Sequence, residues 1–134
     1  MLLSEYDERK IDLPYKMIVS LTKIELRTYS KLPAFFKFNG QIIQEIKQSN
    51  CVQFKVTGNW NLKVWYTMSL WQSEQDLLDF YRNGTHREAM KQATFFSQNM
   101  HTTRIESAQL ISWKAAKKTL QSTENQPKNY KNKQ

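Results

Sequence analysis

The stretch WYTMSLWQSEQDLLDFYRNGTHREAM, residues 65–90, decides the fold. Aromatic and apolar residues fill most of positions 65–71, as in a strand that is buried on both faces. Ser73 then opens SEQD, a typical helix start, because the hydroxyl can accept a hydrogen bond from an unpaired backbone N–H. Apolar residues at helical spacing follow and predict a helix over residues 73–83. Asn83-Gly84 is typical of a left-handed helix end.

The rest of the chain carries strand and helix patterns in alternation. Branched and alternating apolar residues predict the strands, and helical spacing predicts the helices. The predicted elements are a strand over 17–28, a helix capped by Ser30 and running to residue 49, a hairpin of strands over 51–58 and 62–72, the helix over 73–83, a second helix from Thr85, a strand over 100–113 and a short helix over 113–121. Gly40, inside the first helix, is interpreted as a tight helix–sheet contact, with a close approach of backbone or ligand as the alternative.

This order is the βαββαβ pattern of a ferredoxin-like α+β domain, with helices on one face of a four-stranded antiparallel sheet. The domain is assigned to residues 17–113, between an N-terminal arm of residues 1–16 and a short helix with a disordered lysine-rich tail at 114–134. Strands one and three carry apolar residues on both faces. The second sheet face is therefore expected to be covered, and two sheets packed face to face in a homodimer would cover it.

Composition narrows the class of protein. The chain has 134 residues, one cysteine and a formal net charge of +8, which indicates one domain with one core. The lone Cys51 excludes an internal disulfide and fits a reducing cytosol. Because no apolar run spans a bilayer and no secretion signal is visible, a cytoplasmic protein without a membrane partner is predicted. Most of the positive charge lies from Lys114 onward, as in a solvated tail, so a nucleic-acid partner is not expected.

One motif links the chain to a known superfamily. It consists of Trp71, Ser73, Leu77, Phe80, His86, Ala89 and Met90. In the βαββαβ order, this pattern resembles the dimeric α+β barrel proteins, and within them an uncharacterised branch similar to antibiotic-biosynthesis-type monooxygenases. The likeness covers residues 17–113. A more remote likeness, carried by Lys55 and Gly58 ahead of a Trp-containing strand, is to spheroidene-type monooxygenases, which use haem.

The resemblance implies a barrel-forming homodimer with a pocket for a flat hydrophobic molecule. It leaves the activity open, because this fold serves oxygenases, haem-handling enzymes, isomerases and proteins of no known activity. One hypothesis is a monooxygenase-like oxidoreductase that uses either no cofactor or haem. The alternatives are a non-catalytic haem or small-molecule binding protein, and a structural homodimer whose cavity is filled by its own side chains.

His86 is the candidate catalytic residue. It lies in the first turn of a predicted helix, where the helix dipole disfavours protonation of the imidazole. A neutral imidazole can act as a general base or as an axial haem ligand. The structural alternative is that His86 packs under the sheet and hydrogen-bonds a loop carbonyl. A metal site built from His86 and His101 is not predicted, since no third ligand has a recognisable spacing.

The ligand cavity is predicted between the sheet and the helices. Besides His86, the residues predicted to line it are Phe38, Trp65, Trp71, Phe80 and Met90. Alternation along the strand puts Trp65 and Trp71 on one face and Tyr66 on the other. Large aromatic residues on a central strand are also typical of a core, so both interpretations stay open.

Overall fold

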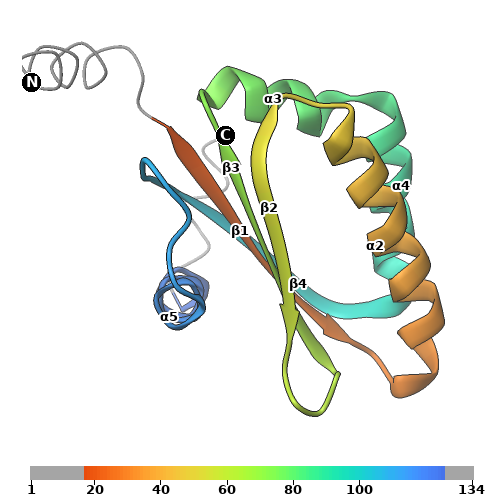
Figure 1. The fold of residues 1–134 in the computed structure, drawn as a ribbon. Helices are drawn as coiled ribbons and strands as arrows, with labels where there is room; N and C mark the ends of the chain where they lie inside the picture. The colour runs from red at the N-terminus through yellow and green to blue at the C-terminus, as the bar shows by residue number, and fades with distance from the viewer. Residues whose placement is uncertain (1–16, 126–134) are drawn as a thin grey trace, which may run out of the picture.

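The computed structural model describes residues 17–125 and has the predicted architecture. Its elements are β1 (Ile18–Leu26), the short 3-10 helix η1 (Tyr29–Lys31), α2 (Leu32–Lys47), β2 (Cys51–Gly58), β3 (Val64–Trp71), α3 (Glu74–Arg82), α4 (Gly84–Phe96), β4 (Ser97–Glu106) and α5 (Trp113–Glu124). The strands form one antiparallel sheet in the order β2-β3-β1-β4. The ferredoxin-like α+β fold is thereby confirmed (Figure 1). The predicted arm and the end of the tail lie outside the described residues.

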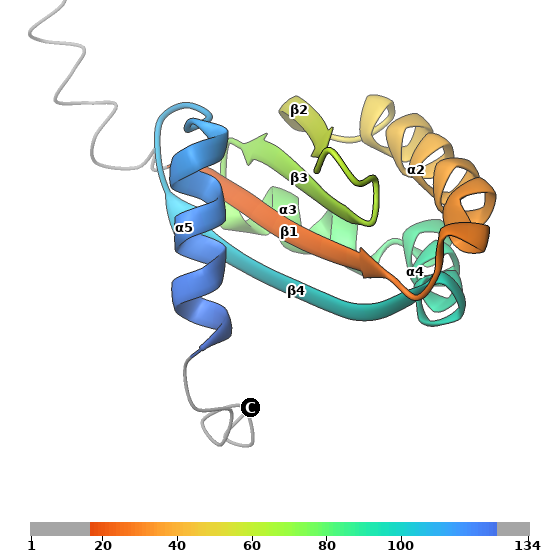
Figure 2. The same ribbon diagram turned by 90° about the horizontal axis from the view of Figure 1, so that it is seen from below.

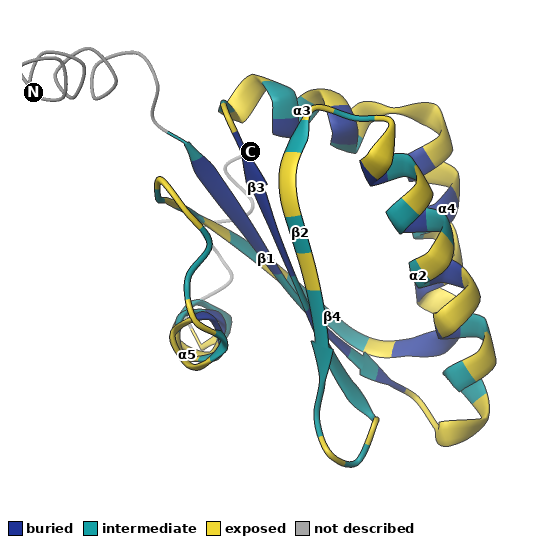
Figure 3. Ribbon diagram, viewed as in Figure 1, coloured by how far each residue is buried: buried dark blue, intermediate teal, exposed yellow. Residues whose placement is uncertain are grey.

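The two central strands, β1 and β3, are buried on both faces (Figure 3). Ile24 points from β1 into a core formed with α2, α3 and α4, whereas Leu21 points into a second core on the opposite face. On β3, Trp71 lies in the first core and Tyr66 in the second, because side chains at odd and even positions of a strand point to opposite faces. The sheet therefore has apolar layers on both sides.

Helix α5 of the same chain packs on the second face of the sheet, against β1 and β4 (Figure 2). Ala116 and Leu120 lie four residues apart on one side of α5 and are buried in the second core. Ser112 caps the helix by accepting a hydrogen bond from the Ala115 N–H. Where α5 packs, the apolar residues of this face need no second protomer to cover them. The homodimer remains a prediction.

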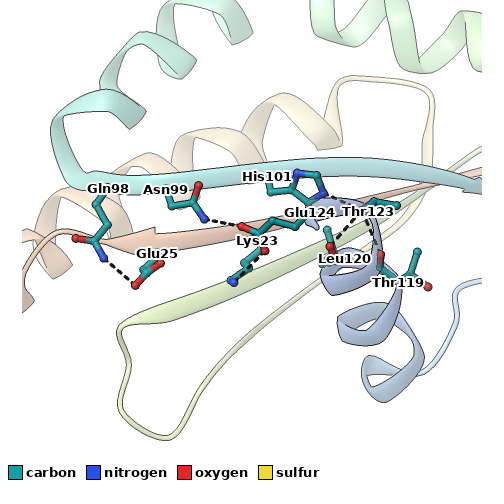
Figure 4. A network of polar contacts seen from close by, with 9 residues as sticks. All are labelled: Lys23, Glu25, Gln98, Asn99, His101, Thr119, Leu120, Thr123 and Glu124. Atoms are coloured by element: carbon teal, nitrogen blue, oxygen red, sulfur yellow. Dashed lines mark hydrogen bonds and ion pairs between the residues drawn. The ribbon is translucent and has the colours of Figure 1, made fainter. Parts of the chain in front are cut away.

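Polar contacts hold the last turn of α5 against β1 and β4 (Figure 4). The Glu124 carboxylate accepts hydrogen bonds from Asn99 at 2.7 Å and from Lys23 at 3.3 Å. These two donors hold the pKa of Glu124 below its usual value. Thr123 is hydrogen-bonded to His101 at 2.7 Å. The helix predicted over 113–121 thus extends to Glu124, and its last turn is bound to β1 and β4.

The predicted boundaries of the last strand are wrong. β4 spans Ser97–Glu106, and residues 107–112 connect it to α5. The reason is that, in the described part of the chain, β1 is the only strand beside β4, and their pairing runs from Leu26–Ser97 to Ile18–Glu106. Beyond Glu106, no strand within residues 17–125 continues the ladder.

Two predicted helix ends are also wrong. Asn83 has φ −60° and ψ 132°, and neither it nor Gly84 is left-handed. Because α4 follows α3 directly, the Asn83 side chain instead caps α4, accepting from the N–H groups of Thr85 and His86. Ser30 lies inside η1 and hydrogen-bonds Thr28, and no side chain caps α2.

Replacing Gly58 or Gly40 with alanine is expected to change the free energy of unfolding in opposite directions. A Cβ at Gly58 would lie 2.8 Å from the Trp65 ring, so Gly58→Ala should lower the free energy of unfolding by about 1–3 kcal/mol. A Cβ at Gly40 would meet nothing within 4 Å, so the tight contact predicted there is wrong. Gly40→Ala should raise stability by about 0.5–1 kcal/mol, as in a helix interior. Urea denaturation measures both, and shifts of the same sign would contradict this account.

Candidate functional site

A cavity of about 620 Å³ lies between the sheet and helices α2, α3 and α4. This volume is within the range of about 300–1,000 Å³ typical of small-molecule sites. Five of the six side chains predicted to surround such a cavity line it: Phe38, Trp71, Phe80, His86 and Met90. Their role in binding a ligand remains a prediction. Because the cavity is open, the structure gives no support to the alternative of a filled one.

Trp65 does not line the cavity. Its ring packs against Phe35, with centroids 5.0 Å apart, and against Phe36 at 5.5 Å. Its N–H donates to the Leu62 carbonyl at 3.0 Å. Trp65 shares a sheet face with Trp71, but six residues along a strand separate two side chains by about 20 Å. A shared face therefore does not place both residues in one cavity.

Hydroxyl groups line the sheet side of the cavity, a feature the sequence patterns did not reveal. They belong to Ser20, Thr22, Thr67, Ser69 and Thr102. The strand register brings them together, with Ser20 opposite Ser69 and Thr22 opposite both threonines. Trp71 donates to the Ser69 hydroxyl at 2.8 Å. The sequence of β1 does contain a sign of this polar surface, because Ser20 and Thr22 interrupt a strand face that is otherwise apolar.

Tyr81 adds a further hydroxyl at the edge of this polar floor. Its Oη lies 2.6 Å from Ser20 Oγ, which ties α3 to β1. Burial raises the pKa of Tyr81, while the hydrogen bond between Tyr81 and Ser20 opposes that change. The phenol therefore stays protonated near neutral pH and can donate a hydrogen bond. The cavity thus combines apolar walls with a hydroxyl-bearing floor.

Glu45, on α2, holds the His86 imidazole in place. His86 Nδ1 lies 3.1 Å from Glu45 Oε1, and the two side chains are only 9% and 11% exposed. The Phe80 and Tyr81 rings flank the imidazole, with centroids at 4.3 and 6.0 Å. The structural alternative of a loop carbonyl as partner is therefore wrong. Glu45 was missed, although it lies seven residues after Phe38, at the spacing of a buried helix face.

The electrostatics of the pair favour a neutral imidazole. Burial lowers the pKa of His86, and the hydrogen bond and charge of Glu45 oppose that shift without reversing it. A carboxylate can only accept, so the contact assigns the ring proton to Nδ1. His86 Nε2 then carries the lone pair and makes no hydrogen bond to any residue of the described range. The imidazole lines the cavity as an available base.

The pair also connects two spaces. Glu45 Oε2 is buried and accepts no hydrogen bond from residues 17–125. Glu45 lines a second, smaller hollow of about 260 Å³, together with Asp76 and Asp79. Glu45 therefore lies between the His86 imidazole and a smaller polar hollow.

Two cations line the cavity from α4, and both are exposed to solvent. Lys91 is paired with Glu88 at 3.0 Å. The Arg87 guanidinium makes no ion pair within the described part of the chain. Arg87 is therefore available to bind an anionic group on a ligand. Among residues 17–125, no cluster of three His, Cys, Asp or Glu side chains could hold a metal ion.

Acidification is expected to destabilise the protein through His86. Because its pKa is lowered by folding, the unfolded chain binds more protons as the pH falls past about 6.5, and stability falls with it. Urea midpoints at about pH 7.5 and pH 5.5 should differ more for wild type than for His86→Gln. An equal difference in the two proteins would show that His86 does not titrate in this way.

Comparison with known proteins identifies the fold. No protein-family model matches the chain, and no curated protein matches it. A solved structure from Caulobacter crescentus, named as a candidate antibiotic biosynthesis monooxygenase, superposes with a TM-score of 0.64 over 75% of this chain and 99% of that one, at 13% identity. The chain shares the fold of this protein.

Two further structures agree. SnoaB, a cofactor-independent oxygenase from Streptomyces nogalater, gives a TM-score of 0.62 at 7% identity, covering 72% of this chain and 97% of its own. A candidate antibiotic biosynthesis monooxygenase from Deinococcus radiodurans gives 0.63 at 11% identity, covering 71% and 96%. The predicted likeness to this group is confirmed for the fold. No helix within residues 17–125 is long and apolar enough to span a membrane.

Proposed function

We propose that this protein binds a flat hydrophobic molecule in the cavity and removes a proton from it with His86, as a monooxygenase-like enzyme that needs no cofactor. The observation that carries the proposal is the pairing of His86 with Glu45 beside an open cavity of about 620 Å³. The fold shared with a cofactor-independent oxygenase supports it.

Proton removal follows from the geometry of the pair. His86 Nε2 accepts a proton from an acidic O–H or C–H group of the bound molecule. The resulting imidazolium is stabilised by Glu45, which accepts the Nδ1 proton at 3.1 Å. The floor hydroxyls and Arg87 can stabilise negative charge on the bound molecule. An electron-rich anion of this kind can itself supply the four electrons that reduce oxygen: one oxygen atom forms a carbonyl at a ring carbon, whose C–H bond breaks, and the other leaves as water. The two hydrogens of that water are the proton removed by His86 and the hydrogen lost from the ring carbon.

Oxygen consumption with a panel of flat phenols tests the proposal. His86→Ala should lower the rate about 100-fold while the phenol still binds, because a positioned base typically contributes that much or more. Glu45→Gln should lower the rate less, since the base remains but its charged partner is lost. His101→Ala, which removes the other histidine, is the matched control and should keep the rate. Equal losses in all three variants would contradict the assignment.

A haem-binding protein is the second candidate, and the free Nε2 of His86 favours it. His86 Nε2 would bind the iron, the apolar walls of the cavity would contact the porphyrin, and Arg87 would pair with its carboxylates. Bound haem would supply iron for oxygen chemistry. A haem titration followed at the Soret band separates the candidates. A saturable band lost in His86→Ala supports haem, whereas oxygen consumption without any band supports the cofactor-free reaction.

A further inference from the structure

One end of the molecule exposes large apolar side chains that the cavity does not use. These are Tyr29, Phe36, Trp60, Leu62 and Phe95, here called the aromatic end. Trp60 is 93% exposed, in the turn of the β2–β3 hairpin. Single exposed apolar residues are common on protein surfaces. A tryptophan that is almost fully exposed, within a group of other exposed aromatic residues, indicates an interaction surface.

Contacts between distant segments bring these residues to one end. The Leu26 N–H donates to the Lys63 carbonyl at 2.8 Å, which joins the end of β1 to the hairpin turn. Trp65 links the same turn to α2, since it donates to Leu62 and packs on Phe36. The hairpin turn and the segment leading into α2 accordingly lie at the same end of the molecule (Figure 1).

The end of α4 joins the same surface. Arg27 donates to the Thr94 carbonyl at 3.1 Å, and Lys31 lies over the Phe95 ring at 3.8 Å. This cation–π contact places a charge directly beside an exposed aromatic ring. Three separate segments of sequence therefore build one surface.

The charge of this end is mainly positive, with Glu25 at its border. Residues 26–44, 59–66 and 92–98 contain Arg27, Lys31, Lys37 and Lys63, and they contain no aspartate or glutamate. The nearest carboxylate in sequence, Glu25, accepts a hydrogen bond from Gln98 at 2.7 Å. Exposed aromatics surrounded by cations match the chemistry of an anionic lipid surface, where indole rings insert at headgroup level and cations pair with phosphates.

We propose that the aromatic end docks on an anionic lipid bilayer, with Trp60 inserting at the level of the headgroups. The inference stands apart from the chemistry of the cavity. It departs from the prediction of no membrane partner, which considered only segments long enough to span a bilayer. A docking surface assembled from three short segments leaves no such run in the sequence.

Cosedimentation of the full chain with lipid vesicles tests this proposal. Wild type should bind vesicles of equal parts phosphatidylserine and phosphatidylcholine, and should not bind phosphatidylcholine alone. Trp60→Ala and Lys37→Glu should each weaken binding about tenfold, because each removes a main contribution to interfacial attachment. Val52→Ala, at the other end of β2, and Lys118→Glu, on α5, are the matched controls and should bind as wild type does.

Three results would overturn the proposal. One is the absence of binding to phosphatidylserine vesicles. Another is an equal loss in Lys37→Glu and Lys118→Glu, which would assign binding to the overall charge and the lysine-rich tail. The third is a wild-type dimer in light scattering that Trp60→Ala dissociates, which would make a second copy of the chain the partner. Circular dichroism of each variant excludes misfolding as the cause of any loss.

Discussion

Replacing Trp71 with alanine is expected to lower the free energy of unfolding by about 3–5 kcal/mol. The Trp71 side chain is 1% exposed and closes one part of the cavity, so its removal leaves a void that the surroundings cannot fill. Its indole also donates to Ser69 at 2.8 Å and packs on Phe80 at 5.1 Å, and both contacts are lost. Because Phe80 packs on His86, the imidazole should become more mobile as well.

Trp60→Ala is the matched control for this prediction. It makes the same chemical change at a side chain that is 93% exposed, so stability should change by no more than about 0.5 kcal/mol. Urea denaturation of both variants measures the difference. Similar losses at the two positions would show that the packing around Trp71 is not as described.

Replacing Leu120 with alanine should lower the free energy of unfolding by about 2–5 kcal/mol. Leu120 is fully buried between α5 and the sheet, where it contributes to the second core. Lys118→Ala, on the exposed side of the same helix, should change stability by less than about 0.5 kcal/mol. The contrast tests whether α5 is an integral part of the domain.

The same pair of variants tests the predicted homodimer. If α5 covers the sheet in solution, wild type should not need a second protomer there, and Leu120→Ala should increase self-association by freeing the apolar face. Light scattering measures the mass of each variant. A wild-type dimer that Leu120→Ala leaves intact, with no loss of stability, would show that α5 does not occupy this face.

The fold could be predicted because its signals are local and repeated. The aromatic run over residues 65–71, the cap at Ser73 and the helical spacing of the residues that follow specify one strand and one helix, and Ser73 does accept from the Asp76 N–H. Alternation along the strands also placed Trp71 and Tyr66 correctly on opposite faces. Periodicity determines which side of an element is buried.

What could not be predicted depends on contacts between distant segments. The partner of His86 lies 41 residues away on α2, and no spacing rule connects the two positions. The element that packs on the second face of the sheet is another example. The apolar residues of that face show that it is buried, but they do not show whether α5 or a second protomer buries it. Trp65 shows the limit of the face argument, because sharing a face with Trp71 does not place it in the same cavity.

The most direct test of the central claim is nitrogen NMR of protein labelled at histidine, with 2-naphthol added as a flat apolar probe. The chain has two histidines, so His101 serves as an internal control. His86 should be neutral at pH 7 with its proton on Nδ1, and the probe should shift the His86 Nε2 signal while His101 stays unchanged. A charged His86, a proton on Nε2, or a His86 signal that saturating probe does not move would contradict a cavity built around an available base.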